Sequence, residues 1–89
     1  MTREQIENYC QEFEATVKFM DGYDDCIVGL VERFGQEPIV CYDFEKVIQK
    51  LISQGMTDEE AHEWYDYNQL GTWVGKETPC FLLKEFYGI

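Results

Sequence analysis

The spacing of apolar residues predicts three helices, of which the first lies near the start of the chain. Apolar side chains recur there at steps of three and four residues, namely Ile6, Tyr9, Cys10, Phe13, Val17 and Met20. This spacing places them on one face of a helix, which we expect from Arg3 to Phe19. A capping-box pattern of Thr2 and Gln5 would begin this helix, and the turn around Gly22 would end it.

Two further helices are predicted in the second half of the chain. The apolar stripe of the first of them consists of Phe44, Val47, Ile48, Leu51 and Ile52. Asp43 is a suitable N-cap for this helix, and Gly55 is a suitable residue to end it. A second capping box, Thr57 with Glu60, begins the next helix. The residues of that helix expected to face the core are Ala61, Trp64 and Tyr65.

Three apolar segments, the first rich in β-branched residues, predict strands: Cys26–Phe34, Ile39–Tyr42 and Cys80–Leu83. The first two surround a short turn, as in a hairpin, and the third is expected to be buried. The resulting order of helix, strand, strand, helix, helix, strand is typical of the α+β class. We therefore predict that residues 1–89 form a single domain. In it, a small, mainly antiparallel three-stranded sheet would pack against about three helices.

The composition adds a strongly acidic charge to this picture. The 89 residues include 18 Asp and Glu but only 7 Lys and Arg, which gives a formal net charge of -11, and 45% of the residues are hydrophobic. This hydrophobic content is sufficient for a folded core rather than a disordered chain. A negative charge of this size attracts basic protein surfaces and repels nucleic acid and anionic lipid. We therefore expect no direct nucleic-acid binding and no membrane binding.

The cysteines, at positions 10, 26, 41 and 80, are expected to be reduced residues of the core. The chain begins without the basic and apolar stretches of an export signal, and no apolar run reaches the ~18 residues of a membrane helix. These features predict a cytoplasmic protein, in which disulfides are rare, whereas an exported protein would permit two. The cysteine spacing and the single histidine, His62, do not fit a zinc site.

Residues suited to catalysis or metal binding are few. The Asp21–Asp25 segment departs from a calcium-binding loop because glycine occupies its second position, so a solvated turn is the simpler interpretation. His62 beside Glu63 would suit acid–base chemistry, but neither a nucleophile motif nor a phosphate-binding loop accompanies them. The sequence therefore predicts no enzyme activity, no metal and no cofactor.

Acidic and aromatic residues concentrate in the third predicted helix and just after it. Carboxylates three and four residues apart are neighbours on a helix surface, where they can imitate a row of nucleic-acid phosphates. A solvated face that only maintains solubility is the alternative. Tyr67 and Trp73 lie where an exposed ring can anchor a partner. The residues that we predict to contact a partner are Asp24, Asp25, Asp58, Glu59, Glu63, Asp66, Tyr67 and Trp73.

Three segments of the chain are similar to one group of proteins. They are Gly35–Asp43 (GQEPIVCYD), Gly55–Ala61 (GMTDEEA) and Tyr67–Gly75 (YNQLGTWVG). In these segments the chain resembles short, uncharacterised acidic proteins of tailed bacteriophages, and the similarity spans about Asp21 to Leu82. Such a group carries no assigned activity, so the resemblance transfers no functional residue. It implies a phage-encoded protein in the bacterial cytoplasm, where small acidic proteins often inhibit host defence or nucleic-acid enzymes.

Together these features predict a non-enzymatic binding or inhibitor protein. Its acidic surface would dock on a basic, nucleic-acid-binding host protein, such as a nuclease, a defence protein or a transcription component. Two other classes remain open. One is a structural or assembly protein that self-associates through an aromatic face, and the other is a small-molecule-binding protein. The residues considered for such a pocket are Cys10, Cys26, Cys41 and His62.

Overall fold

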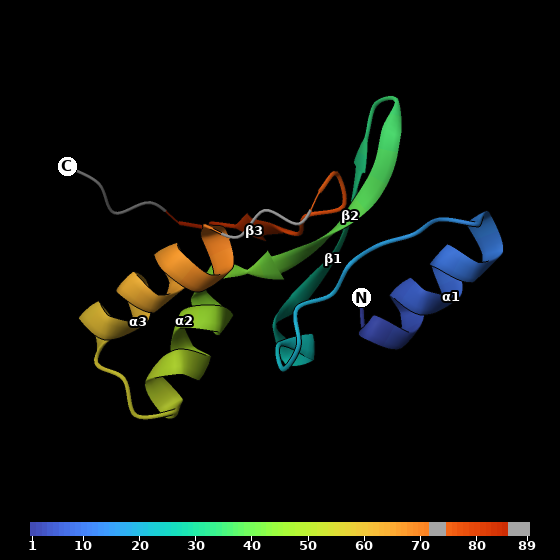
Figure 1. Cartoon of the computed structure of the whole chain (residues 1–89). Coiled ribbons are helices and arrows are strands. Elements are labelled where there is room, and N and C mark those ends of the chain that lie inside the picture. Colours follow the sequence, from blue (N-terminus) through green and yellow to red (C-terminus); the bar gives the residue numbers. More distant parts are fainter. Residues whose placement is uncertain (72–74, 86–89) are drawn as a thin grey trace.

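A computed structural model describes residues 1–71 and 75–85 of the chain (Figure 1). The helices are α1 (Arg3–Phe13), α2 (Phe44–Ser53) and α3 (Asp58–Tyr65), with a 3-10 turn, η1 (Asp24–Cys26), and a π-helical turn, η2 (Asp66–Leu70). The strands are β1 (Ile27–Arg33), β2 (Gln36–Asp43) and β3 (Cys80–Leu82). Figure 1 shows α2 and α3 together at one end of the sheet and α1 away from them, near β1.

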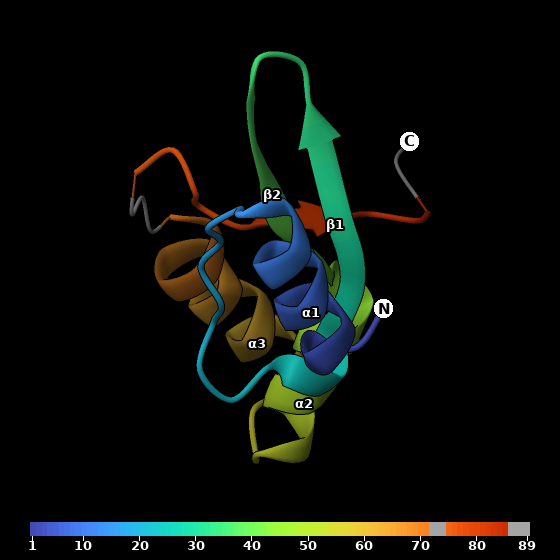
Figure 2. The same cartoon turned by 90° about the vertical axis from the view of Figure 1, so that its right-hand side faces the viewer.

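The strands form one sheet in the order β1-β2-β3, which confirms the predicted α+β class. β1 and β2 form an antiparallel hairpin that projects beyond the helices, with Phe34 fully exposed at its turn (Figure 2). β3 runs parallel to β2 over three residue pairs, so the sheet is mixed, while the longer pairing of β1 with β2 is antiparallel as predicted. The chain crosses from β2 to β3 through α2 and α3, and a crossover of this kind lets the next strand run in the same direction.

α1 is shorter than its apolar spacing predicts, because it ends at Phe13 instead of Phe19. Glu14 adopts a left-handed conformation with φ 54°, which ends the helix. The residues that follow have no regular secondary structure. From this segment the Met20 N–H donates a hydrogen bond of 2.7 Å to the Tyr42 hydroxyl on β2. The apolar side chains after Phe13 therefore pack against the core from a segment that is not helical.

The predicted starts of α2 and α3 are confirmed. The Asp43 side chain caps α2 by accepting a hydrogen bond of 3.3 Å from the Lys46 N–H. Thr57 and Glu60 exchange the two hydrogen bonds of a capping box, at 3.2 and 2.9 Å, and so begin α3. Gly55 follows the end of α2 with φ +105°, the left-handed conformation expected of a glycine that ends a helix.

One hydrophobic core joins the helices to the sheet. Its buried members are Ile6, Cys26, Ile27, Val40, Tyr42, Val47, Ile48, Leu51, Ala61 and Tyr65. Ala61 and Tyr65 are buried as predicted, but Trp64 is 45% exposed. Trp64 lies about 100° from Tyr65 around the helix axis, so a helix that packs through Ala61 and Tyr65 turns this ring outward. β3, predicted to be buried, is an edge strand and only half-buried.

Candidate partner-binding face

The densest concentration of negative charge lies on α3 and η2. Between Thr57 and Gly71 the sequence contains no lysine or arginine, and its carboxylates are Asp58, Glu59, Glu60, Glu63 and Asp66. All of these side chains are exposed. The carboxylates of the first turn also stabilise α3, because they face the positive end of the helix dipole. We call these five residues, together with Trp64 and Tyr67, the acidic face.

An open depression on the acidic face is lined by two of its carboxylates and by both of its rings. Its lining is Met56, Glu60, Glu63, Trp64, Tyr67 and Asn68. Trp64 is 45% exposed and Tyr67 is 82% exposed, so both rings offer surface to a partner. Carboxylates beside aromatic rings suit an arginine or lysine side chain, which forms ion pairs with the former and cation–π contacts with the latter.

The structure brings together only some of the predicted contact residues. Those that lie on α3 and η2 are Asp58, Glu59, Glu63, Asp66 and Tyr67. Trp73 lies outside the described residues. Asp24 and Asp25 lie in η1, which packs against α2.

The two η1 aspartates are paired with cations of the same chain. Asp24 Oδ1 lies 3.2 Å from Arg3 Nη1, and Asp25 Oδ1 lies 2.9 Å from Lys50 Nζ. The hydrogen bond from Lys50 lowers the pKa of Asp25 below its ordinary value. Because these charges are compensated internally, we leave both aspartates out of the acidic face.

Four residues of the depression, Met56, Glu60, Trp64 and Asn68, are absent from the sequence-based prediction of contact residues. Glu60 forms part of the capping box, and Trp64 was expected in the core. The signal that would have found them is the spacing of Met56, Glu60, Trp64 and Asn68 at steps of four, beside the predicted Glu63 and Tyr67. This spacing defines a mixed acidic and aromatic stripe on one side of a helix.

His62 is the side chain of this region best suited to proton transfer, but its polar contacts are local. Its Nδ1 lies 2.8 Å from the Asp58 carbonyl oxygen and 3.6 Å from Asp58 Oδ2, one helical turn away. Within residues 1–71 and 75–85, no group of three or more His, Cys, Asp or Glu side chains is arranged to hold a metal ion.

The four cysteines carry free thiols, of which those of Cys26 and Cys41 are buried and those of Cys10 and Cys80 are half-buried. Burial raises the pKa of Cys26 to about 11. The pKa of Cys41 is raised to about 12, mainly by burial and to a lesser degree by a hydrogen bond with the Cys80 thiol. Both thiols therefore stay protonated near neutral pH, which makes them poor nucleophiles.

The fold and this face define a small α+β protein with a mixed acidic and aromatic surface on one helix. Comparisons with protein-family models, with curated proteins and with solved structures found no match to this chain. The resemblance to phage proteins therefore stays a prediction. In the described part of the chain, no helix is both long enough and apolar enough to span a bilayer.

Proposed function

We propose that this protein is a non-enzymatic binding protein whose acidic face docks on a basic surface of another protein. The observation that supports this most is the shared depression of Glu60, Glu63, Trp64 and Tyr67. Neither glutamate forms an ion pair with a lysine or arginine among the described residues. The Glu63 carboxylate is therefore available to cations from outside the chain, whereas Glu60 offers them Oε2, because its Oε1 accepts the capping hydrogen bond from the Thr57 N–H.

An arginine of the partner fits this arrangement best. Its planar guanidinium pairs with a carboxylate through two parallel hydrogen bonds, and it also stacks on an aromatic ring. The carboxylates around the depression attract the basic partner over a longer range and speed its approach. Trp and Tyr rings are also among the side chains that contribute most of the binding energy at protein interfaces.

We propose a nucleic-acid-binding protein of a bacterial host as the partner, for example a nuclease, a defence protein or a transcription component. The basic surfaces of such proteins normally contact phosphates, which an array of carboxylates imitates. Occupancy of that surface would keep nucleic acid out. The bacterial host follows from the resemblance to phage proteins, and the acidic face supports only the basic character of the partner.

The test begins with capture of partners from bacterial lysate on the immobilised protein and on two variants of equal charge. Glu60→Gln/Glu63→Gln removes two charges at the depression, and Glu4→Gln/Glu12→Gln removes two exposed charges on α1. For a purified partner we expect the dissociation constant to rise by at least about tenfold with the first variant. The Glu4→Gln/Glu12→Gln variant should affect binding only through long-range electrostatics, so we expect its dissociation constant to rise by less than about twofold.

Binding is measured over a range of salt concentrations, and nucleic acid is added as a competitor. Affinity that falls as salt rises, together with displacement by nucleic acid, supports the proposal. Equal loss of affinity in the two variants would show that only net charge matters, and salt-insensitive binding would remove the electrostatic basis.

Self-association is the competing class of function. Copies that each carry a net charge of -11 repel one another, which opposes assembly at low salt. Light scattering over a concentration series separates the two classes, because the proposed binding protein remains a monomer in the absence of its partner.

A further inference from the structure

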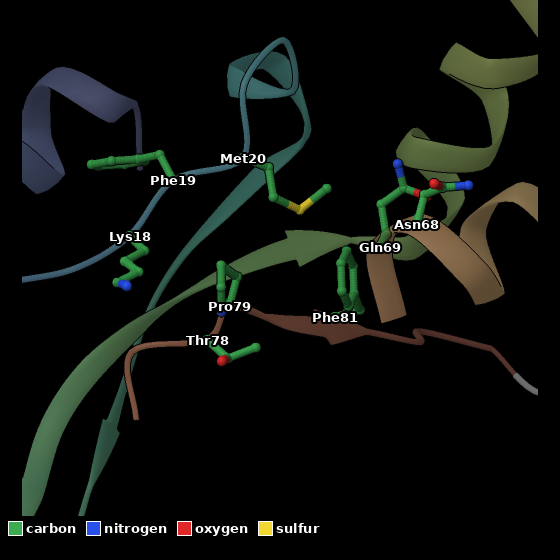
Figure 3. Close-up of a pocket in the computed structure, with 8 residues that line it drawn as sticks. All are labelled: Lys18, Phe19, Met20, Asn68, Gln69, Thr78, Pro79 and Phe81. Carbon is green, nitrogen blue, oxygen red and sulfur yellow. The ribbon is translucent and has the colours of Figure 1, made fainter. Parts of the chain in front are cut away.

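An open groove of about 530 Å³ lies between β3, η2 and the helices α2 and α3. Leu70 and Leu83 in its wall are 59% and 58% exposed, and Phe44 and Phe81 supply further apolar surface. Of the residues that the sequence suggested for a pocket, His62 alone belongs to the described lining. The Phe81 ring points from β3 toward η2, where it also lines the pocket drawn in Figure 3. The groove therefore follows the side of β3 that is turned toward the helices.

The two edges of the sheet differ in how the chain covers them. Beside β1, the Met1 ammonium donates a hydrogen bond of 3.0 Å to the Val28 carbonyl oxygen, and α1 packs against the strand. On the other edge, the backbone of Cys80–Leu82 forms no hydrogen bond with any described residue outside β2. An uncovered edge presents N–H and C=O groups that can pair with a strand of another protein.

β3 and the groove complement each other as a binding site. A strand of three residues offers few outward-facing backbone groups, and so short an edge alone resists pairing. The groove adds apolar contact area, because side chains alternate along an added strand and every second one would point into it. Peptides that extend a sheet bind in this combined way, through main-chain hydrogen bonds and through pockets for alternate side chains.

The charges around the groove favour a basic strand. Asp66, which belongs to the acidic face, also lines the groove, and the described lining contains no lysine or arginine. Lys84, which follows Leu83, is engaged by Asp43 at 2.7 Å. The net charge of -11 attracts a basic segment and repels an acidic one.

We infer that the partner adds an extended segment to β3 as a further strand, with alternate apolar side chains in the groove and basic side chains between them. This inference rests on the proposed function for the basic character of the partner, and it specifies the conformation of the segment that binds. The groove and the depression of Glu60 and Glu63 have different linings, so the two sites can be tested separately.

The experiment titrates the ¹⁵N-labelled full chain with the end-blocked peptide RVRVRV. We expect saturable shifts of the amide signals of Leu70, Phe81 and Leu82, and slower hydrogen exchange at the β3 amides that do not bond to β2. The charge-reversed peptide EVEVEV should not bind. RVRVRV with every backbone nitrogen methylated should bind at least about fivefold more weakly, the effect of losing one neutral hydrogen bond.

Three results would overturn the inference. The first is the absence of these shifts or of the slower exchange with RVRVRV. The second is equal binding of the methylated peptide, which would exclude main-chain pairing. The third is equal binding of EVEVEV, which would exclude a basic segment as the preferred occupant.

Variants locate the peptide. Leu70→Ser/Leu83→Ser removes two exposed apolar side chains of the groove and should weaken RVRVRV binding by at least about tenfold. Phe13→Ser/Phe34→Ser removes two exposed rings elsewhere and should leave binding unchanged. If a variant does not fold, the three peptides on the unaltered chain decide the question.

The charge variant of the acidic face separates the two hypotheses. Glu60→Gln/Glu63→Gln should weaken RVRVRV binding by less than about twofold. If this variant loses the peptide and the leucine variant keeps it, the peptide binds in the depression, so the inference is wrong and the proposed function stands. If the peptide behaves as expected but Glu60→Gln/Glu63→Gln leaves partner binding unchanged, the proposed function of the acidic face is wrong and strand addition to β3 stands.

Discussion

At the scale of single residues, Asp43 connects β2 to α2 and also holds the segment after β3. Its Oδ1 accepts the capping hydrogen bond from Lys46, and its Oδ2 lies 2.7 Å from Lys84 Nζ. Burial works against ionisation of this carboxyl, but the hydrogen bonds from Lys84 and from the Lys46 N–H outweigh it and lower the pKa of Asp43. The charged form is therefore more favourable in the folded state than in the unfolded state.

This pKa shift has a defined effect on stability. A lowered pKa in the folded state stabilises the protein fully above the unfolded value of about 3.9, and the effect disappears as pH falls through the lower folded value. Asp43→Asn keeps an N-cap but loses the charge, so it should be less stable than the parent chain at pH 7. The difference should shrink at about pH 3 and below. Urea unfolding followed by circular dichroism at both pH values measures this, and a difference independent of pH would contradict it.

Asp43→Ala serves as the companion variant. It removes the cap as well as the charge, so at pH 7 its free energy of unfolding should fall below that of Asp43→Asn by a further ~1 kcal/mol. Equal stability of the two variants would show that the hydrogen bond to Lys46 contributes nothing to the start of α2.

At the scale of elements, β3 is the edge strand of the sheet and pairs with β2 over three residues. The first pair in this parallel register is Cys41 with Cys80. Neighbouring strands lie about 4.8 Å apart, within the range of Cα separations of about 4.4 to 6.8 Å that disulfides span. Cys80 also contributes to the raised pKa of Cys41, as expected of thiols paired on neighbouring strands.

We expect the thiol oxidant diamide to link Cys41 to Cys80 within one chain. The two thiols together lose two hydrogen atoms, which reduce the diamide to its hydrazine. Reaction should begin at the half-buried Cys80 and be slow, because the thiol of Cys41 is buried and protonated. Peptide mass spectrometry with and without a reductant identifies the link. Cys10→Ser should keep it and Cys41→Ser should lose it, whereas a product joined through Cys26 would contradict the observed register.

At the scale of the whole molecule, charge is the dominant feature. The net charge is -11, and the described ion pairs engage Arg3, Lys50 and Lys84 with carboxylates of the same chain. The acidic face contains no lysine or arginine, so mutual repulsion among its carboxylates opposes the compact state. Salt screens this repulsion more than it weakens the few exposed ion pairs, each of which contributes about 1 kcal/mol or less.

Added salt should therefore stabilise the protein. Between about 20 mM and about 500 mM NaCl, we expect the melting temperature to rise by several degrees, since ~1 kcal/mol corresponds to ~4–8 °C in a domain of this size. Thermal unfolding by circular dichroism measures this. Glu63→Gln/Asp66→Asn, which removes two charges of the acidic face beyond the first turn of α3, should melt at a higher temperature in low salt and respond less to added NaCl. A melting temperature that falls with salt would show that internal ion pairs outweigh repulsion.

The helix caps were predictable because they depend on residues a few positions apart. Thr57 with Glu60 and the Asp43 N-cap needed only local spacing, and both are present as expected. The end of α1 was not predictable in the same way. Val17 and Met20 continue the helical spacing, but the hydrogen bond between Met20 and the distant Tyr42 belongs to a non-helical segment.

The candidate site likewise has some features that the sequence predicts and others that it does not. The acidic residues of α3 and η2 could be found by reading the sequence, since exposure is the usual state of a carboxylate. The exposure of Trp64 and the burial of Gln69 could not, because a large apolar ring is normally expected inside and an amide outside. The pairing of Asp24 with Arg3 was equally hidden, since these residues meet only when α1 and η1 come together.

The sequence alone determined the α+β class, the starts of α2 and α3, and the excess of negative charge. These properties follow from counts and from spacings within one or two helical turns, where the geometry of the chain is nearly constant. Only the tertiary structure decided that β3 lies parallel to β2, that α1 stops at Phe13, and that Gln69 is buried with its oxygen unpaired. These outcomes depend on the surfaces that distant segments present to one another, which local spacing does not specify.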